Sequence, residues 1–192
     1  MKKLSVLRTI AVFLGLMAIL VWAGAAAAGP EKLKGDYAFT GEATCITSQS
    51  GFNSDQTPIG TSFITSFSVQ GVWTFNDNGT GTREGRCVSV TGDPYPGASS
   101  QDILAPSGYT VGSDGTITTW LTSPLTGTVL TGLRAGQTFT IDQIRLKGII
   151  SKDEKSLTIA SEEPEIETVT YSNGNIFFRI CHRSRVLLWL EK

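Results

Sequence analysis

Hydrophobic and polar residues alternate along most of this chain, which is the pattern of β-strands with one buried face. The clearest example runs from residue 61 to residue 75, TSFITSFSVQGVWTF. Its odd positions hold most of the large apolar residues, and its even positions are mainly Ser, Thr and Gln. The segment ends at Asn76-Asp77-Asn78-Gly79, residues that tolerate a positive φ, and Thr-rich extended sequence follows. We therefore predict a β-hairpin at this point.

Similar turn signals recur along the chain and divide it into short extended segments. Ser113-Asp114-Gly115, the charged run 152–155 and Ser172-Asn173-Gly174 each separate two strand-like runs. We count about eight to ten strands and find no helical periodicity beyond the N-terminal segment. An antiparallel series of hairpins must close on itself or pack against a second sheet to protect its edges. The prediction is an all-β, antiparallel, up-and-down β-barrel.

Two stretches break the alternation. Residues 49–60 and 92–107 are rich in Gly, Pro, Ser and Asp, which predicts long loops. The acidic run Glu162-Glu163-Pro164-Glu165 is typical of a solvated turn.

The N-terminus has the composition of a secretory signal peptide. A basic start is followed by the apolar run 10–22 and then by small residues up to Pro30. We predict a signal peptide over residues 1–28, a single domain over residues 29–192, and a secreted or periplasmic protein. An uncleaved membrane anchor is the alternative, since residues 10–28 are 19 uncharged residues. After cleavage we expect no stable membrane span.

Removal of residues 1–28 changes the formal charge, because Lys2, Lys3 and Arg8 are lost while all 17 acidic residues remain. The balance becomes 13 minus 17, or −4. This charge gives no electrostatic basis for binding nucleic acid. An outer-membrane barrel is also disfavoured, because candidate strands such as SLTIAS are too short and polar to face lipid.

Three cysteines, Cys45, Cys87 and Cys181, would meet an oxidising compartment in an exported protein. Cys45 and Cys87 both lie in strand-like runs of the first half of the chain. We predict a Cys45–Cys87 disulfide with Cys181 reduced. The alternative is that all three are small buried thiols.

Motifs of catalysis, metal binding and cofactor binding are absent from the sequence, so we predict no catalytic residue, metal or cofactor. GTGTREG (79–85) lacks the Lys and Ser or Thr that follow the last glycine of a phosphate-binding loop. The single histidine, His182, lies in the segment NIFFRICHRSRVLLWL. Its even positions are apolar except for His182 and Ser184, and its odd positions include Arg179, Arg183 and Arg185. This register predicts that His182 and Ser184 face the interior and that the arginines face solvent.

Two segments carry a family resemblance. LKGDYAFTGEATC (33–45) and VQGVWTFNDNGTGT (69–82) resemble exported bacterial proteins of unknown function whose barrels are similar to those of lipocalins and allene oxide cyclase. The resemblance implies a calycin-like barrel of about eight strands and brings no catalytic residues. The lipocalin Gly-x-Trp signature is not met, since Asp36 and Tyr37 follow Gly35.

The first functional hypothesis is a module that binds a small apolar or amphipathic molecule in the cell envelope. A barrel filled by its own side chains, with a structural or interaction role, is the second, and a cyclase-like or isomerase-like enzyme is the third. The candidate ligand-binding residues are those expected to face the interior: Tyr37, Phe39, Phe67, Trp73, Phe75, His182 and Ser184.

Overall fold

The computed structural model describes residues 33–191, so the predicted signal peptide lies outside the described residues. Within them the protein is all-β, and no helix is present that is long and apolar enough to cross a membrane. The eleven strands are β1 (Gly35–Ser48), β2 (Ser62–Phe75), β3 (Thr80–Thr91), β4 (Gly97–Val111), β5 (Thr116–Leu121), β6 (Leu125–Val129), β7 (Thr138–Ile141), β8 (Arg145–Ile150), β9 (Ser156–Ala160), β10 (Ile166–Tyr171) and β11 (Ile176–Trp189).

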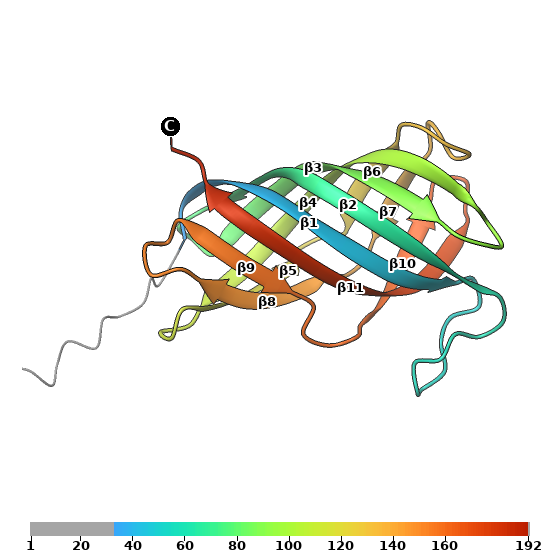
Figure 1. Cartoon of the computed structure of the whole chain (residues 1–192), viewed down its shortest axis with the longest axis horizontal. Coiled ribbons are helices and arrows are strands. Elements are labelled where there is room, and N and C mark those ends of the chain that lie inside the picture. Colours follow the sequence, from blue (N-terminus) through green and yellow to red (C-terminus); the bar gives the residue numbers. More distant parts are fainter. Residues whose placement is uncertain (1–32, 192) are drawn as a thin grey trace, which may run out of the picture.

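All eleven strands belong to one antiparallel sheet that closes in a ring (Figure 1). The pairing of β1 with β11 along nearly the whole length of both strands closes it. Each end of β11 pairs with a different short strand on its other side, β9 at one end and β10 at the other. In the same way, β5 and β6 lie end to end at one position in the ring, beside β4, and β8 and β7 lie end to end at the next. Five long strands and three split positions therefore give a ring of eight positions, which is why eleven strands replace the predicted eight to ten.

The predicted hairpin at residues 76–79 is confirmed. β2 and β3 pair antiparallel on either side of it, from Phe75 opposite Gly81 to Thr65 opposite Thr91. Gly79 has a φ of 83°, a conformation that glycine adopts without steric cost.

The predicted loop at residues 92–107 is largely wrong, because β4 begins at Gly97. Pro106 lies within this strand, where a proline would normally remove a hydrogen bond of the ladder. β4 pairs with β6 up to Leu104 and with β5 from Ser107 onwards. Pro106 thus falls at the change of partner, where the ladder on that side is already interrupted.

The disulfide joins Cys45 to Cys181, so the predicted Cys45–Cys87 pair is wrong and Cys87 is the free cysteine. Cys45 and Cys181 lie directly opposite each other across the β1–β11 pair, with their Cα atoms 4.0 Å apart. Strand β2 separates β1 from β3. Two strand spacings are roughly 10 Å, more than the roughly 7 Å that a disulfide bridges. The disulfide therefore fastens the seam at which the ring closes.

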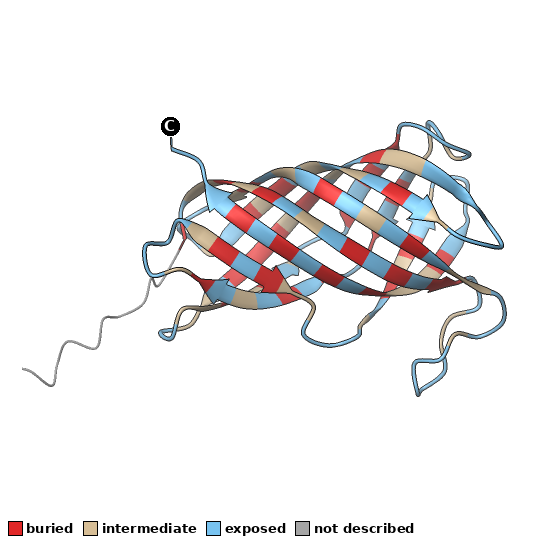
Figure 2. Cartoon of the chain, viewed as in Figure 1, coloured by how far each residue is buried: buried red, intermediate tan, exposed pale blue. Residues whose placement is uncertain are grey.

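Burial alternates along the strands, as the period-two pattern predicts, with one residue facing the interior and the next facing outward (Figure 2). The interior is not uniform along the axis of the ring. Large apolar side chains occupy the end where β1 begins and β11 ends, whereas charged and polar side chains occupy much of the other half. The two ends of the interior are therefore filled by side chains of different chemistry.

Candidate functional site

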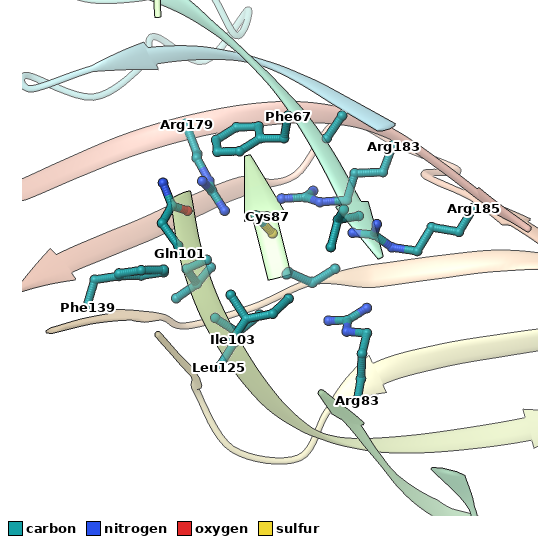
Figure 3. A pocket seen from close by; sticks show the side chains of 14 residues that line it. Phe67, Arg83, Cys87, Gln101, Ile103, Leu125, Phe139, Arg179, Arg183 and Arg185 are labelled. Carbon is teal, nitrogen blue, oxygen red and sulfur yellow. The ribbon is translucent and has the colours of Figure 1, made fainter. Parts of the chain in front are cut away.

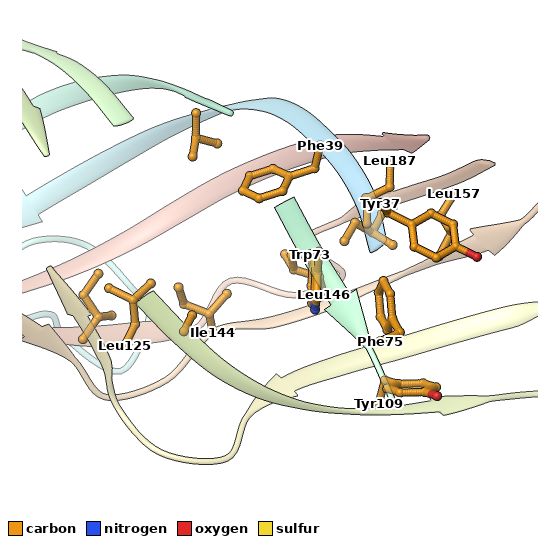
Figure 4. Packing of buried hydrophobic residues seen from close by; sticks show 14 of the residues in the cluster. Tyr37, Phe39, Trp73, Phe75, Tyr109, Leu125, Ile144, Leu146, Leu157 and Leu187 are labelled. Carbon is orange, nitrogen blue, oxygen red and sulfur yellow. The ribbon is translucent and has the colours of Figure 1, made fainter. Parts of the chain in front are cut away.

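Aromatic side chains fill the end of the interior where β1 begins and β11 ends (Figure 4). Trp73 and Phe75 stack with their ring centroids 5.2 Å apart. Tyr37 and Tyr109 each contact the Phe75 ring edge-on, at centroid distances of 5.4 and 5.1 Å. Tyr37, Phe39, Trp73 and Phe75 are each at most 3% exposed. Four of the predicted ligand-binding residues therefore belong to a packed core.

The polar atoms of these core aromatics have hydrogen-bond partners. The Trp73 indole Nε1 donates to Ser107 Oγ at 3.1 Å, and the Tyr37 hydroxyl donates to the Glu154 carbonyl oxygen at 2.8 Å. The Tyr109 hydroxyl lies 2.6 Å from the carbonyl oxygen of Leu33, which is itself fully buried at this end. Burial raises the pKa of Tyr37 to about 12. At this end the aromatic rings are closely packed and their polar atoms are hydrogen-bonded.

The face of β11 that points inward is the opposite of the predicted one. Arg183 and Arg185 are 5% and 7% exposed, whereas His182 and Ser184 are exposed on the outer face. The prediction placed the apolar even positions inside, because apolar faces are normally buried. Here those positions form part of an apolar outer surface, and the interior beside them is polar. His182 and Ser184 are therefore not in a position to contact a ligand inside the ring.

Four arginines line the cavity in this half: Arg83 of β3 and Arg179, Arg183 and Arg185 of β11. Arg83 extends from the wall opposite β11, and its guanidinium group points toward those of Arg183 and Arg185 (Figure 3). Sequence reasoning missed all four. The spacing of Arg179, Arg183 and Arg185, which puts three arginines on one face of a single strand, is the signal that would have found three of the four.

Glu167 of β10 supplies a buried carboxylate to this cluster and is 1% exposed. Its carboxylate accepts from Arg179 Nε at 2.9 Å and from Arg183 Nη2 at 2.7 Å, and it also pairs with Arg183 Nη1. Four guanidinium groups thus face one bonded carboxylate, a formal excess of three positive charges. Neither Arg83 nor Arg185 forms an ion pair with Glu167.

Among residues 33–191, no carboxylate forms an ion pair with the buried side chains of Arg83 and Arg185. The guanidinium carbon of Arg83 lies over the Trp73 ring, 4.8 Å from its centroid, and that of Arg185 lies over the Phe39 ring, 5.8 Å from its centroid, so each guanidinium group makes a cation–π contact. Arg83 Nε, Arg185 Nε and Arg185 Nη1 are buried and have no hydrogen-bond partner. Burial, together with a smaller effect of the neighbouring arginines, lowers the pKa of Arg83 to about 10 and that of Arg185 to about 9.

Three adjoining cavities lead from these arginines toward the end of the ring where β1 ends and β2 begins. The innermost, about 50 Å³, is lined by Arg83, Arg183, Arg185 and apolar residues that include Phe67. It shares Phe67, Gln101 and Arg179 with a middle cavity of about 90 Å³. The middle cavity shares Phe63, Gln101 and Tyr171 with an outer one of about 350 Å³. Phe67 is thus the one predicted ligand-binding residue that lines the innermost cavity.

Cys87 also lines the innermost cavity, on the inward face of β3. Burial raises the pKa of its thiol, and the four surrounding arginines oppose that shift without reversing it. Cys87 is the free cysteine of a chain with three, so a thiol reagent reports on this cavity alone.

No protein-family model, curated protein or solved structure is similar enough to this chain to count as a match. The site is therefore interpreted from its own geometry.

Proposed function

We propose that this protein is a calycin-like, up-and-down β-barrel that is exported to the cell envelope and binds a small amphipathic molecule in its interior. The unequal filling of that interior carries the proposal. One end is packed with aromatic rings whose polar atoms are bonded. The other half contains adjoining cavities lined by both arginines and aromatic rings.

The chemistry along these cavities supports an amphipathic ligand over a purely apolar one. The innermost cavity combines Arg83 and Arg185 with apolar side chains. The outermost is lined by Phe63, Tyr95 and Leu133 among other residues. Ligand sites are commonly apolar with a few placed polar groups that fix orientation. Arg134 lines both the middle and the outer cavity, so polar groups recur along the path, and a molecule that carries both polar and apolar groups matches this mixed lining.

The proposed export rests on two independent observations. Residues 1–28 have the composition of a signal peptide, and the disulfide Cys45–Cys181 is of a kind that persists in oxidising compartments.

A filled barrel with a structural role is the second candidate function, favoured by the packed aromatic end. The two candidates differ in their response to ligands, because anything that binds only the folded state raises its stability. An enzyme of the cyclase or isomerase class would use the same cavity and remains a third hypothesis.

Native mass spectrometry of protein purified from its own host tests the proposal, together with thermal unfolding against a panel of lipids and small metabolites. We expect a bound small molecule, or a ligand-dependent rise in Tm. Phe67→Ala should weaken that response, whereas His182→Ala, on the outer face, serves as the matched control. A protein that carries no adduct and gains no stability from any compound would favour the filled structural barrel.

A further inference from the structure

Two arginines that face the innermost cavity lack any anionic partner among the described residues. Arg83 is 2% exposed and Arg185 is 7% exposed. Arg83 Nε, Arg185 Nε and Arg185 Nη1 have no acceptor. Glu167, the carboxylate nearest in the cluster, is bonded to Arg179 and Arg183. A buried charge is tolerated when it is paired and hydrogen-bonded, and these two are neither.

The stacked aromatics do not meet this requirement. Trp73 and Phe39 contact the guanidinium groups of Arg83 and Arg185 and favour positive charge there. A π-face stabilises a cation less than removal from water destabilises it. Stacking also leaves the N–H groups at the edge of each guanidinium unused. The two arginines thus contact aromatic rings and still have N–H donors available.

We infer that the ligand carries an oxyanion, and that Arg83 and Arg185 bind this oxyanion as the head of an amphipathic acid. The inference rests on the proposed function and names the chemical class of its ligand. The planar guanidinium presents paired donors that match the two oxygens of a carboxylate. Water would accept the same hydrogen bonds but would not balance the excess of positive charge.

The position of the cavities sets the orientation of the ligand. The head would lie in the innermost cavity of about 50 Å³, which has room for a carboxylate-sized group. The apolar chain would extend through the middle cavity, past Phe67, Phe139 and Phe177, toward Phe63 in the outer one. Arg134 also lines the middle and outer cavities, with its guanidinium carbon 4.8 Å from the Tyr171 ring centroid, so the chain would pass a second cationic group there. Gln101 lines all three cavities and would lie beside the chain along its path.

Isothermal titration calorimetry of the mature, disulfide-bonded protein at pH 7 and low ionic strength tests the inference. The probes are octanoate, 1-octanol and inorganic phosphate, in a buffer without carboxylate. We expect octanoate to bind and 1-octanol, which has the same chain length, to bind far more weakly. Arg185→Met and Arg83→Met should each weaken octanoate binding by about 30-fold or more, since each removes one partner of a buried charged pair.

Arg86→Met is the matched control, because Arg86 lies on the outer face of β3 in an exposed ion pair with Asp102. It should leave octanoate binding unchanged. Arg185→Lys keeps the charge without the paired donors and should give intermediate affinity. The Tm of every variant, measured without ligand, shows that each is folded.

The remaining outcomes separate the inference from the proposed function. Equal binding of octanoate and 1-octanol, unaffected by Arg185→Met, would overturn the oxyanion head and leave the binding function standing. Arg185-dependent binding of phosphate without binding of octanoate would overturn the amphipathic ligand and support a site for a small anion. Failure of all three probes to bind would overturn both.

Discussion

The interior of the ring has two halves that are stabilised in different ways. Around Trp73, aromatic rings stack and their polar atoms find hydrogen-bond partners. Around Arg185, buried guanidinium groups outnumber the carboxylate that neutralises them, and cavities adjoin the cluster. The same closed sheet surrounds both halves. The comparison indicates that the sheet and the aromatic end hold the fold together, while the charged half retains groups that stability alone would not select.

The largest expected effect on stability comes from removing the disulfide that joins β1 to β11, which lies in the charged half. Replacing both Cys45 and Cys181 by Ala should destabilise the protein by about 5 kcal/mol, because the disulfide closes a loop with a sequence separation of 136. Urea unfolding measures the loss. Hydrogen exchange should rise more in β10 and the adjacent part of β11 than in β1 and β2 near Trp73. Equal acceleration in both regions would mean that the two halves are not separate in stability.

The next effect contrasts one aromatic residue from each half. Trp73→Ala should cost about 3–5 kcal/mol, because it leaves a cavity in a packed core. Phe67→Ala should cost less than about 2 kcal/mol, because its ring already borders a cavity. Chemical denaturation of the two variants under identical conditions gives the comparison. Similar losses would show that the cavity end is as tightly packed as the other.

Charge substitutions in the second half should have opposite signs. Glu167→Gln should destabilise the protein by about 3 kcal/mol, because it leaves Arg179 and Arg183 buried without their carboxylate. Arg185→Met should instead stabilise the ligand-free protein by about 1 kcal/mol, because it removes a buried charge that has no partner.

Glu84→Gln, on the exposed outer face of β3, is the control for this pair and should change stability by less than about 0.5 kcal/mol. Thermal and urea unfolding without ligand measure all three variants. A loss of stability in Arg185→Met comparable to that in Glu167→Gln would mean that Arg185 has a structural partner, and it would remove the motive for an oxyanion site.

The last expected effect is a dependence of stability on alkaline pH that differs between the halves. The pKa of Tyr37 is raised from 10.0 to about 12, so its contribution to stability is complete below pH 10 and is lost as the pH rises to about 12. The pKa of Arg185 is lowered from its ordinary value to about 9, so above about pH 9 the unfolded state binds more protons and this group makes stability rise with pH. A plot of unfolding free energy against pH from 8 to 11 should therefore have a more negative slope in Arg185→Met, and a less negative slope in Tyr37→Phe, than in the parent protein. Identical slopes in both variants and the parent protein would contradict these assignments.

The sequence was sufficient to predict the all-β class, the hairpin at residues 76–79 and the burial of Trp73, because period-two patterns and turn residues are local signals. The disulfide was not predictable in this way. Cys45 and Cys181 become neighbours only when the first and last strands pair, which no local pattern encodes. The inward face of β11 was predicted wrongly because burial was assigned to its apolar positions. Its arginines are inside because Glu167 and the rings of Phe39 and Phe67 contact them there, and these partners lie on other strands that no local pattern brings together.

The most direct test of the central claim, that the charged half is a ligand site, uses the free thiol of Cys87 in the innermost cavity. The rate of alkylation by the neutral reagent iodoacetamide would be followed by intact-protein mass spectrometry at pH 8, with increasing octanoate. We predict that the rate falls with octanoate concentration to a low plateau, and that Arg185→Met abolishes this protection. An alkylation rate that stays constant up to millimolar octanoate, in protein whose Cys45–Cys181 disulfide is intact, would contradict the account.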